Sequence, residues 1–372
     1  MTAPPALDLT ALVRPAVHAI SSYIPAKVEP GAERVIKLDM NESPYGPSPR
    51  TRAALAGFVA TQRYPSFDAI ELRQHVAPYL GVPVEQVSAG AGLDDVLNNL
   101  MTLLIDPGDE IVISEPTFGV YRALASLRGG VTVDVPLTPA PDFTLRPEAI
   151  LAAIGPRTKL VVICDPNNPT GNPFDPAAVE RVVANAPCLV AIDEAYAEFA
   201  GTTAIGLMAR HDNVCVLRTM SKFAGLAGMR VGYGAFPPAL MPLLWRVTPA
   251  FCNLSAASQA AAVASLADLD YLRREVVGRI VADRDALAAG LRSIPGVEPF
   301  PSVTNFILAR LPVAGAGPVV ARLAARGVHV RYFGNPALGL RDCLRVSIGT
   351  PAEHAVFLDE LQAALAAKGI AA

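Results

Sequence analysis

The chain has 372 residues, of which 52% are hydrophobic and 17% charged, and its formal net charge is −3. This composition supplies a large buried core and is unlike that of disordered chains, which are poor in apolar residues. The length suggests about two domains. The small negative charge gives no electrostatic reason to expect nucleic acid or an anionic membrane as a partner.

The chain start and the cysteines predict a cytoplasmic protein. The first twenty residues have no basic region, and Asp8 interrupts their apolar part, so we expect no signal peptide. No apolar run approaches the roughly 18 residues that a membrane-spanning helix needs. The five cysteines form no CxxC pair, which favours reduced thiols in a cytoplasm over disulfides. The histidines lack metal-ligand spacing, so we expect no metal site.

Residues 1–50 are rich in proline and end in "NESPYGPSPR". Proline and glycine at this density favour turns over long helices. We therefore expect residues 1–50 to form an N-terminal arm that also contributes to a smaller domain.

A pattern of strands follows. "EIVISEP" (110–116) and "VTVDVPL" (131–137) are rich in Val and Ile and predict two strands. Near-continuous apolar runs begin at Lys159, Cys188 and Val214. Such runs are typical of strands buried on both faces of a parallel sheet.

Helices alternate with these strands. Asp175 is expected to cap a helix that has Pro176 in its first turn. Strand–helix alternation predicts an α/β fold with right-handed crossovers. After residue 275 the pattern changes to a shorter set of helices and strands. We expect a large domain over 51–275 and a small α/β domain over 276–372.

Polar residues follow each of the three buried runs. The first run leads into Asp165-Pro166-Asn167-Asn168, the second into Asp193-Glu194-Ala195-Tyr196, and the third into Ser221-Lys222. Each set alone also fits an ordinary turn or helix cap. In an open α/β sheet, however, ligands bind beyond the carboxyl ends of the strands. The coincidence of an amide, a carboxylate and an amine at one edge therefore predicts a ligand site.

In the stretch over 88–105, a glycine-rich turn leads into a predicted helix that has Val96, Leu97, Leu100, Met101 and Leu104 on its apolar side. Gly90-Ala91-Gly92 would leave free N–H groups at the helix start, which favours an anion such as phosphate. Close packing of the glycines is the alternative interpretation. A dinucleotide fingerprint is disfavoured because Asp95 replaces the third glycine of GxGxxG.

These residue types suit pyridoxal 5′-phosphate. A lysine such as Lys222 can form a covalent bond with an aldehyde, and a carboxylate such as Asp193 can hold the ring nitrogen protonated. The other expected partners are the turn over 90–94 with Ser221 and Arg230 for the phosphate, Asn168 and Tyr196 for the ring oxygen, and Phe118 for the ring face.

Three blocks resemble the class I/II, fold-type I pyridoxal-phosphate aminotransferases: "DPNNPTG" (165–171), "AIDEAYAEF" (191–199) and "RTMSKFAGLAGMRVGYG" (218–234). "LDMNESPYGPSP" (38–49) and "VRYFGNPALGLRDCLRVSIGT" (330–350) resemble the histidinol-phosphate aminotransferase branch. The resemblance implies a large domain with a mostly parallel central sheet, a smaller C-terminal α/β domain and an N-terminal arm.

The resemblance also implies residue roles. Lys222, Asp193 and Tyr196 would be catalytic, and Leu93, Asp94, Phe118, Asn168, Ser221, Arg230 and Tyr64 would bind the cofactor. Arg345, Arg331, Tyr23 and Asn168 would bind substrate. Tyr64 would reach the site of a neighbouring subunit, which implies a homodimer with shared sites. The chain departs from the branch at Phe118, where tyrosine is common, and at Leu93, where a small or hydroxyl residue is expected.

The implied reaction is transamination between a small-molecule amino donor and a 2-oxo acid. The expected donor is histidinol phosphate, which carries a phosphate and no α-carboxylate. An aromatic amino acid is the alternative donor, because a guanidinium such as that of Arg345 can bind a carboxylate or a phosphate. A decarboxylase or lyase of the same fold is a second alternative, and a binding domain without activity is a third.

Overall fold

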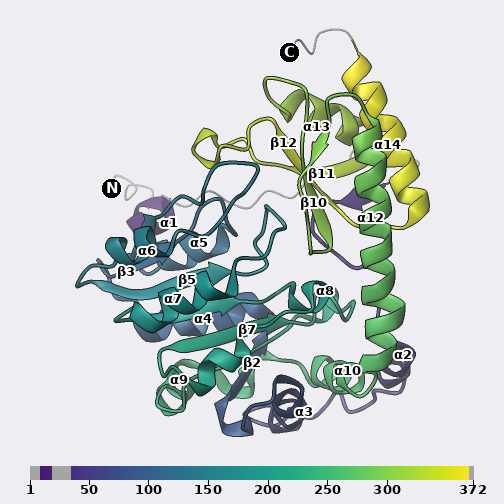
Figure 1. The fold of residues 1–372 in the computed structure, drawn as a ribbon. Coiled ribbons are helices and arrows are strands. Elements are labelled where there is room, and N and C mark those ends of the chain that lie inside the picture. The colour runs from purple at the N-terminus through teal and green to yellow at the C-terminus, as the bar shows by residue number, and fades with distance from the viewer. Residues whose placement is uncertain (1–8, 19–34, 368–372) are drawn as a thin grey trace, which may run out of the picture.

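The computed structural model describes residues 9–18 and 35–367. Two sheets dominate it, one in the lower and one in the upper part of Figure 1. The larger sheet has seven strands, in the spatial order β2 (Val87–Ala91), β8 (Val231–Ala235), β7 (Val214–Thr219), β6 (Leu189–Asp193), β5 (Thr158–Cys164), β3 (Glu110–Ile113) and β4 (Val131–Asp134). Neighbouring strands from β7 to β4 are parallel, whereas β8 is antiparallel to both β7 and β2.

The three apolar runs form adjacent central strands, as their sequence predicts. Every residue of β6 and β7 is buried, and β5 is buried except at Lys159. Alternate residues of β5 enter different cores: Leu160 and Val162 belong to one apolar cluster, Val161 and Ile163 to another. The sheet therefore separates two hydrophobic layers, which is why its strands lack polar alternation.

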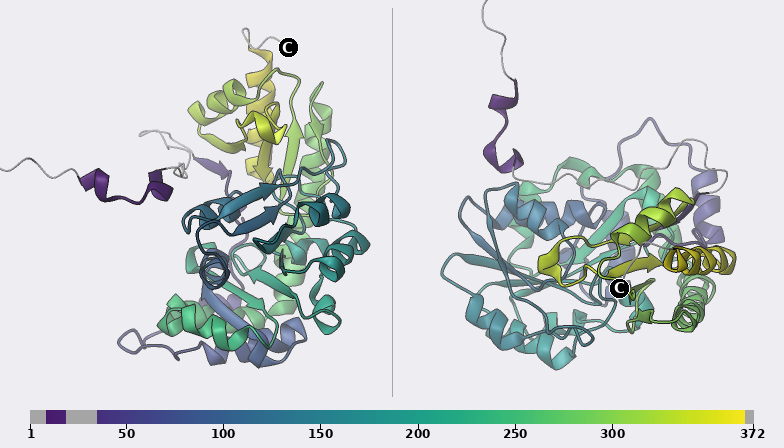
Figure 2. Two further views of the ribbon diagram at one scale, coloured as in Figure 1. Left: turned by 90° about the vertical axis from the view of Figure 1, so that its left-hand side faces the viewer. Right: turned by 90° about the horizontal axis from the view of Figure 1, so that it is seen from above.

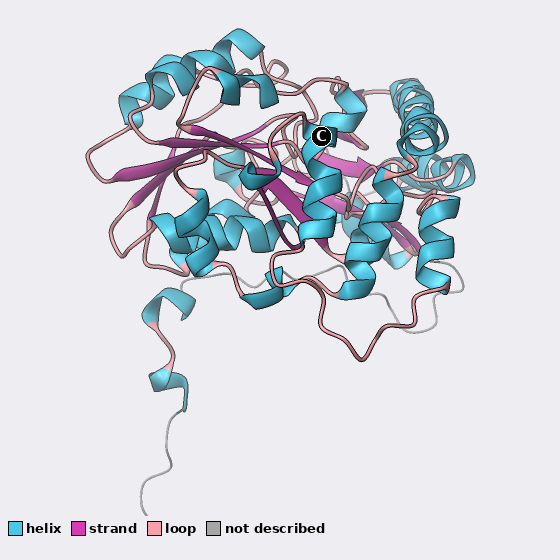
Figure 3. Cartoon of the chain, turned by 90° about the horizontal axis from the view of Figure 1, so that it is seen from below, coloured by secondary structure: helices cyan, strands magenta, loops and turns pink. Residues whose placement is uncertain are grey.

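Helices cover both faces of this sheet (Figure 3). The helices of this part of the chain are α2 (Pro49–Ala56), α3 (Ile70–Leu80), α4 (Leu93–Leu104), α5 (Val120–Ser126), α6 (Pro147–Ala153), α7 (Pro176–Asn185), α8 (Ala197–Ala200), α9 (Met241–Val247) and α10 (Ala256–Leu266). The start of α7 is as predicted: Asp175 is the N-cap, its carboxylate accepts from the Ala177 N–H, and Pro176 follows.

Two strands end earlier than their sequences predict. β3 stops at Ile113 and β4 at Asp134, before Pro116 and Pro136. Proline has no N–H for a ladder hydrogen bond, so the segments that approach it leave the sheet.

The second sheet has five strands, in the order β1 (Ile36–Leu38), β11 (Val328–Tyr332), β12 (Cys343–Ser347), β10 (Phe306–Arg310) and β9 (Glu298–Pro299). Its helices are α12 (Gly278–Ser293), α13 (Gly317–Ala325) and α14 (Pro351–Ala366). β1 pairs parallel with β11, so residues 36–38 belong to this sheet, whereas its other four strands come from residues 298–347.

A helical path joins the two parts. It runs from α11 (Leu269–Tyr271) through a π-helical turn over Leu272–Val277 into α12, which rises along the side of both sheets (Figure 1). In contrast, the short helices η1 (Leu9–Leu12) and α1 (Pro15–His18) project away from the rest of the molecule (Figure 2).

Short 3-10 turns complete the described elements: η2 (Val84–Gln86), η3 (Ile205–Ala209), η4 (Ala227–Met229), η5 (Ala250–Asn253) and η7 (Pro336–Leu338). None of the helices within 9–18 and 35–367 has the length and apolar character needed to cross a membrane. Over the same residues, no cluster of three His, Cys, Asp or Glu side chains is arranged to hold a metal ion.

Candidate active site

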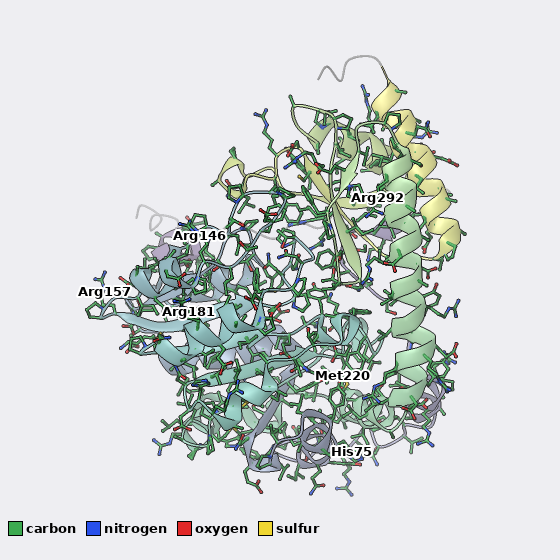
Figure 4. The ribbon with its side chains drawn as sticks, in the orientation of Figure 1. His75, Arg146, Arg157, Arg181, Met220 and Arg292 are labelled. Atoms are coloured by element: carbon green, nitrogen blue, oxygen red, sulfur yellow. The ribbon has the colours of Figure 1, made fainter. Side chains whose placement is uncertain are left out.

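The carboxyl ends of β5, β6 and β7 bring the predicted polar residues to one edge of the large sheet. Cys164 pairs with Asp193 across β5 and β6, and Asp193 pairs with Leu217 across β6 and β7. The loops after these strands carry Asn168, Tyr196 and Lys222. Met220, two residues before Lys222, lies inside the lower part of the molecule in Figure 4 and is fully buried.

Lys222 holds its amine against the N-terminal segment. Its Nζ donates a hydrogen bond of 3.1 Å to the carbonyl oxygen of Met40. Burial, followed by the positive charge of Arg345, lowers the pKa of the Lys222 amine to about 8. About half of the amine is therefore unprotonated at pH 8, and a nucleophile or base must be unprotonated.

Asp193 is buried at the end of β6 and held through both carboxylate oxygens. The Tyr121 hydroxyl donates to Oδ2 at 2.5 Å, and the Ala195 N–H donates to Oδ1 at 3.0 Å. Burial raises the pKa of Asp193 to about 6, while these two hydrogen bonds act in the opposite direction. At neutral pH the carboxylate is ionised and can bind a protonated ring nitrogen.

Tyr121 is a site residue that the sequence interpretation missed. It lies on α5, is fully buried, and packs edge-on against Phe118 with ring centroids 5.7 Å apart. Its position three residues after the predicted ring-stacking residue was the available signal. From sequence alone, a tyrosine in an apolar helix is expected to be an ordinary core residue. Its hydrogen bond to Asp193 becomes evident only in the folded structure.

Asn168 and Tyr196 lie together, and Arg345 joins them. Nδ2 of Asn168 donates a hydrogen bond of 3.3 Å to the Tyr196 hydroxyl. Oδ1 of Asn168 accepts a hydrogen bond of 2.6 Å from Arg345 Nη1. The second Arg345 nitrogen, Nη2, donates to the carbonyl oxygen of Asp39 at 2.6 Å. The predicted ring-oxygen ligands and a predicted substrate ligand are thus one hydrogen-bonded group.

Asn41 also belongs to this group and was not predicted. Its Nδ2 donates to the Tyr196 hydroxyl at 3.0 Å, and its side chain is buried. The motif "NESPYGPSP" contains it, but nothing in the sequence spacing indicated that the residue would reach an element more than 150 positions away.

The start of α4 and Arg230 form the opposite end of the site. Gly92 precedes the helix without a side-chain cap, so the first N–H groups at Leu93 and Asp94 can face an anion. Arg230 reaches this turn: Nη2 lies 3.0 Å from the Asp94 carboxylate and Nη1 lies 3.4 Å from Ser221 Oγ.

Two glycines make this approach possible. A Cβ on Gly92 would lie 2.2 Å from Arg230 Nη2, and the residue has φ of +86°. A Cβ on Gly232 would lie 2.3 Å from the Gly92 carbonyl carbon. The small residues after Lys222 thus let β8 pass directly behind the turn and return Arg230 to it.

The remaining predicted residues have different surroundings. Arg331 is directly opposite Arg345 in the antiparallel pairing of β11 and β12, so both side chains leave the same face of the small sheet. Tyr64 is 83% exposed and stacks on Phe251 with ring centroids 4.8 Å apart. Tyr23 lies outside the described residues.

Together these groups suit pyridoxal phosphate. The site offers an amine of lowered pKa, a buried carboxylate held by two donors, and an uncapped helix start beside a guanidinium. It also offers a tyrosine hydroxyl that accepts from two amides and keeps its own proton for another acceptor.

Comparison with known proteins agrees with this interpretation. Residues 33–361 match the family described as "Aminotransferase class I and II". The chain therefore belongs to this aminotransferase family, whose fold-type I architecture its two sheets reproduce.

Its relatives define the branch. The chain is 42% identical to the histidinol-phosphate aminotransferase of Roseiflexus castenholzii, over 95% of this chain and 98% of that protein. It is 36% identical to the chloroplastic histidinol-phosphate aminotransferase of Nicotiana tabacum, over 92% and 84% of the two chains. These similarities place it in the histidinol-phosphate aminotransferase branch of the family.

A solved structure gives the same result. The histidinol-phosphate aminotransferase of Sinorhizobium meliloti, crystallised in complex with pyridoxal-5′-phosphate, superimposes with a TM-score of 0.85 at 29% identity. The similarity covers 97% of both chains. The site described above fits the same cofactor.

Proposed function

We propose that this protein is a pyridoxal-phosphate-dependent histidinol-phosphate aminotransferase of histidine biosynthesis. It would transfer the amino group of histidinol phosphate to 2-oxoglutarate, giving imidazole acetol phosphate and glutamate. Identity of 42% along almost the entire length to a protein of that name supports the proposal. The residue types gathered at the site also support it.

The bound cofactor supplies an aldehyde that takes up the amino group and a ring that accepts electrons. Asp193 would keep the ring nitrogen protonated, since its carboxylate is ionised at neutral pH. Lys222 would anchor the cofactor and then move the proton at the substrate's Cα, for which an amine with a pKa of about 8 is suited. Asn168 and Tyr196 would hold the ring oxygen, and Phe118 the ring face.

The phosphate of the cofactor would lie at the start of α4. The backbone N–H groups of Leu93 and Asp94, the Ser221 hydroxyl and the Arg230 guanidinium converge there. Binding of a dianion by helix N–H groups and a guanidinium is strong because the helix dipole and the charge act in the same direction.

The opposed arginines carry the proposal for the substrate. Arg331 and Arg345 occupy facing positions on β11 and β12, so two guanidinium groups leave the same face of the small sheet. A phosphate fits two guanidinium groups better than a single carboxylate does, because it offers more acceptor oxygens and a higher charge. Tyr23 would contact the distal part of the substrate.

An aromatic amino acid remains the second candidate donor, because the bond from Arg345 to Asn168 places one guanidinium next to the cofactor site. The α-carboxylate of such a donor would bind there.

A donor comparison tests the assignment. With 2-oxoglutarate as acceptor, we expect kcat/KM for histidinol phosphate to exceed that for phenylalanine and tyrosine by about 100-fold, roughly what one extra charged hydrogen-bonded pair supplies. Arg331→Gln should remove most of that preference, because it removes the second guanidinium expected to bind the phosphate. The Arg345 guanidinium beside Asn168 stays in place and can still bind a carboxylate. Equal or higher kcat/KM for the aromatic amino acids would contradict the proposal, and release of carbon dioxide without a keto acid would indicate a decarboxylase.

We also propose a homodimer that shares its sites. Tyr64 and Val59 are more than 80% exposed, and Phe67 is 60% exposed, although all three are apolar or aromatic. A neighbouring subunit that covers this surface would receive the Tyr64 hydroxyl near its cofactor phosphate. Such a patch is typical of an interface with another protein.

Two further proposals concern organisation. We propose that the two sheets are the cores of a large domain over 51–275 and a small domain over 276–372, with residues 1–50 as an arm and part of the small domain. The pairing of β1 with β11 supports that last assignment. We propose a cytoplasmic location, in keeping with the free thiols of Cys164, Cys188, Cys215 and Cys343.

A further inference from the structure

We propose that Asn41 is a positioning residue that directs the proton of the Tyr196 hydroxyl toward the ring oxygen of the cofactor. The inference rests on the proposed function, because it needs the ring oxygen to lie at Tyr196. It assigns a role in the site to the N-terminal segment "NESPYGPSP", which the sequence interpretation used only to select the branch. The observations that carry it are the directions of five hydrogen bonds.

The orientation of the Asn41 amide is set by Ser347. The Asn41 backbone N–H donates to Ser347 Oγ at 2.8 Å, so this oxygen is already an acceptor. The Ser347 hydroxyl then donates its own hydrogen to Asn41 Oδ1 at 3.0 Å. Both residues are buried. With Oδ1 used in this way, the NH₂ group of Asn41 must face Tyr196.

The orientation of the Asn168 amide is set by Arg345. A guanidinium can only donate, so the oxygen that lies 2.6 Å from Arg345 Nη1 must be Asn168 Oδ1. The NH₂ group of Asn168 therefore faces Tyr196 as well.

The Tyr196 oxygen thus accepts from two amides, at 3.0 Å from Asn41 and 3.3 Å from Asn168. A phenol has one hydrogen to donate, and neither amide can receive it. Among the described residues these two amides are the hydrogen-bond partners of that hydroxyl. The hydrogen is left for a ligand, and the ring oxygen expected beside Asn168 is the acceptor in reach.

The backbone holds Asn41 in this place. Its carbonyl oxygen accepts from Asn305 Nδ2 at 2.9 Å, and its φ is +53°. Asparagine tolerates this left-handed conformation better than most residues. Ser347 and Arg345 are two positions apart on β12, so their side chains leave the same face of the sheet toward the segment 39–41.

The chemical consequence concerns the charge of the ring oxygen. A donated hydrogen bond stabilises an anionic oxygen more than a protonated one, so it lowers the pKa at which the visible absorption of the cofactor-loaded protein changes. Asn41→Asp keeps the size and the backbone preference but replaces the donor by an acceptor. The Tyr196 hydrogen would then bond to the new carboxylate instead of the cofactor.

The test is a pH titration of the visible absorption band in four proteins: wild type, Asn41→Asp, Tyr196→Phe and the double variant. We expect Asn41→Asp and Tyr196→Phe each to raise the pKa of the band by about 1–2 units, the effect of one hydrogen bond to a charged group. In the Tyr196→Phe background, Asn41→Asp should add less than half of its own shift, because the hydrogen it redirects is absent. The part of the pKa shift that Asn41→Asp still causes in the Tyr196→Phe background is the effect of the new negative charge.

Equal shifts from Asn41→Asp in both backgrounds would overturn the proposal, since the charge alone would then explain them. Ser347→Ala serves as a second variant that introduces no charge and frees the Asn41 amide to turn. It should raise the pKa of the band in the wild-type background and leave it unchanged in the Tyr196→Phe background. An unchanged pKa in Ser347→Ala, with cofactor bound, would also overturn the proposal, even if Asn41→Asp fails to fold.

The same data separate this inference from the proposed function. A wild-type protein that shows no visible band with pyridoxal phosphate would contradict the cofactor assignment itself. A wild-type band that moves in Tyr196→Phe but not in the Asn41 and Ser347 variants would contradict the positioning role alone.

Discussion

At the scale of single residues, Lys222 combines a charge with a position at the edge of the core. Long cations are seldom fully buried without a partner, and Lys222 has a backbone carbonyl rather than a carboxylate against its amine. Burial, followed by the positive charge of Arg345, disfavours the ammonium form and lowers the pKa of the amine from the ordinary 10.5 to about 8. The amine is therefore available as a nucleophile at a pH where a surface lysine would remain protonated.

This lowered pKa predicts a pH profile for the cofactor-free protein. Only an unprotonated amine attacks an aldehyde, so covalent uptake of pyridoxal phosphate should accelerate about tenfold per pH unit below pH 8 and level off above it. Absorbance at the visible band measures the rate. Lys222→Ala should show no such uptake at any pH, and a profile that keeps rising toward pH 10 would contradict the assignment.

The two neighbouring buried carboxylates, Asp193 and Glu194, have different hydrogen-bond partners. Asp193 is held by donors that carry no charge, Tyr121 and the Ala195 N–H, and is thus available to a positively charged ring. Glu194, its neighbour, accepts two bonds from the Arg218 guanidinium at 2.7 and 2.9 Å and is already neutralised. The two adjacent carboxylates therefore have different partners: Asp193 lies at the candidate site, and Glu194 forms an ion pair with Arg218.

At the scale of elements, the turn from β2 into α4 forms the proposed phosphate site. β8 lies so close behind it that only glycine fits at positions 92 and 232, and Arg230 folds over Gly92. The helix start, the guanidinium and Ser221 are therefore positioned by one local packing arrangement.

A matched pair of glycine variants tests this arrangement. Gly92→Ala should weaken pyridoxal phosphate binding by roughly 10- to 100-fold, because the new methyl group displaces Arg230 and costs a charged hydrogen bond. Gly108→Ala is the control: its φ is +89°, close to that of Gly92, but nothing lies within 4 Å of the added methyl group. Both variants should lose about 1 kcal/mol of folding stability from the positive φ.

Titration of the cofactor-free variants with pyridoxal phosphate gives the dissociation constants, and thermal unfolding gives the stabilities. Equal cofactor affinity in the two variants would show that Arg230 is not part of the phosphate site.

At the scale of the whole molecule, the site lies where the two sheets meet. Lys222, Asp193 and Tyr196 come from the large sheet, whereas Arg331, Arg345 and Ser347 come from the small one. The segment over 36–41 connects them: its strand β1 pairs with β11, and Asn41 bonds to Tyr196. Tyr45, a few residues further on, donates to Asp283 on α12 and lies under the Arg279 guanidinium.

The proposed dimer predicts that two inactive variants complement each other. Tyr64→Ala would damage the site of the neighbouring subunit, whereas Lys222→Ala damages its own. Random mixing of the two should place both defects in one site of each hybrid dimer and restore about a quarter of the sites, as two-fold symmetry requires. Steady-state activity after subunit exchange measures the gain.

The matched control for this experiment is a mixture of Lys222→Ala with Asp193→Asn. Both residues belong to the same site within one subunit, so each hybrid site keeps one defect and no activity should return. A monomeric mass in sedimentation, or no gain with Tyr64→Ala, would contradict a shared site.

The central strands of the large sheet and many of the candidate site residues could be predicted from local sequence. The three central strands were recognisable because burial on both faces leaves unbroken apolar runs, and the polar residues after Cys164, Asp193 and Thr219 were recognisable because they interrupt those runs. Asn41 and Tyr121 could not be found in that way. Each is a polar group in an unremarkable setting whose partner is remote in sequence: Tyr196 for Asn41 and Asp193 for Tyr121.

The sequence by itself determined the chemistry of this protein, because covalent cofactor binding, ring-nitrogen pairing and phosphate binding each need a particular residue type at the end of a particular strand. Only the tertiary structure decided how these groups are aligned. Hydrogen-bond direction depends on which donor faces which acceptor, and chains such as Ser347 to Asn41 to Tyr196 form between segments that local patterns do not relate. The same holds for the facing arginines, whose opposition follows from the register of β11 and β12.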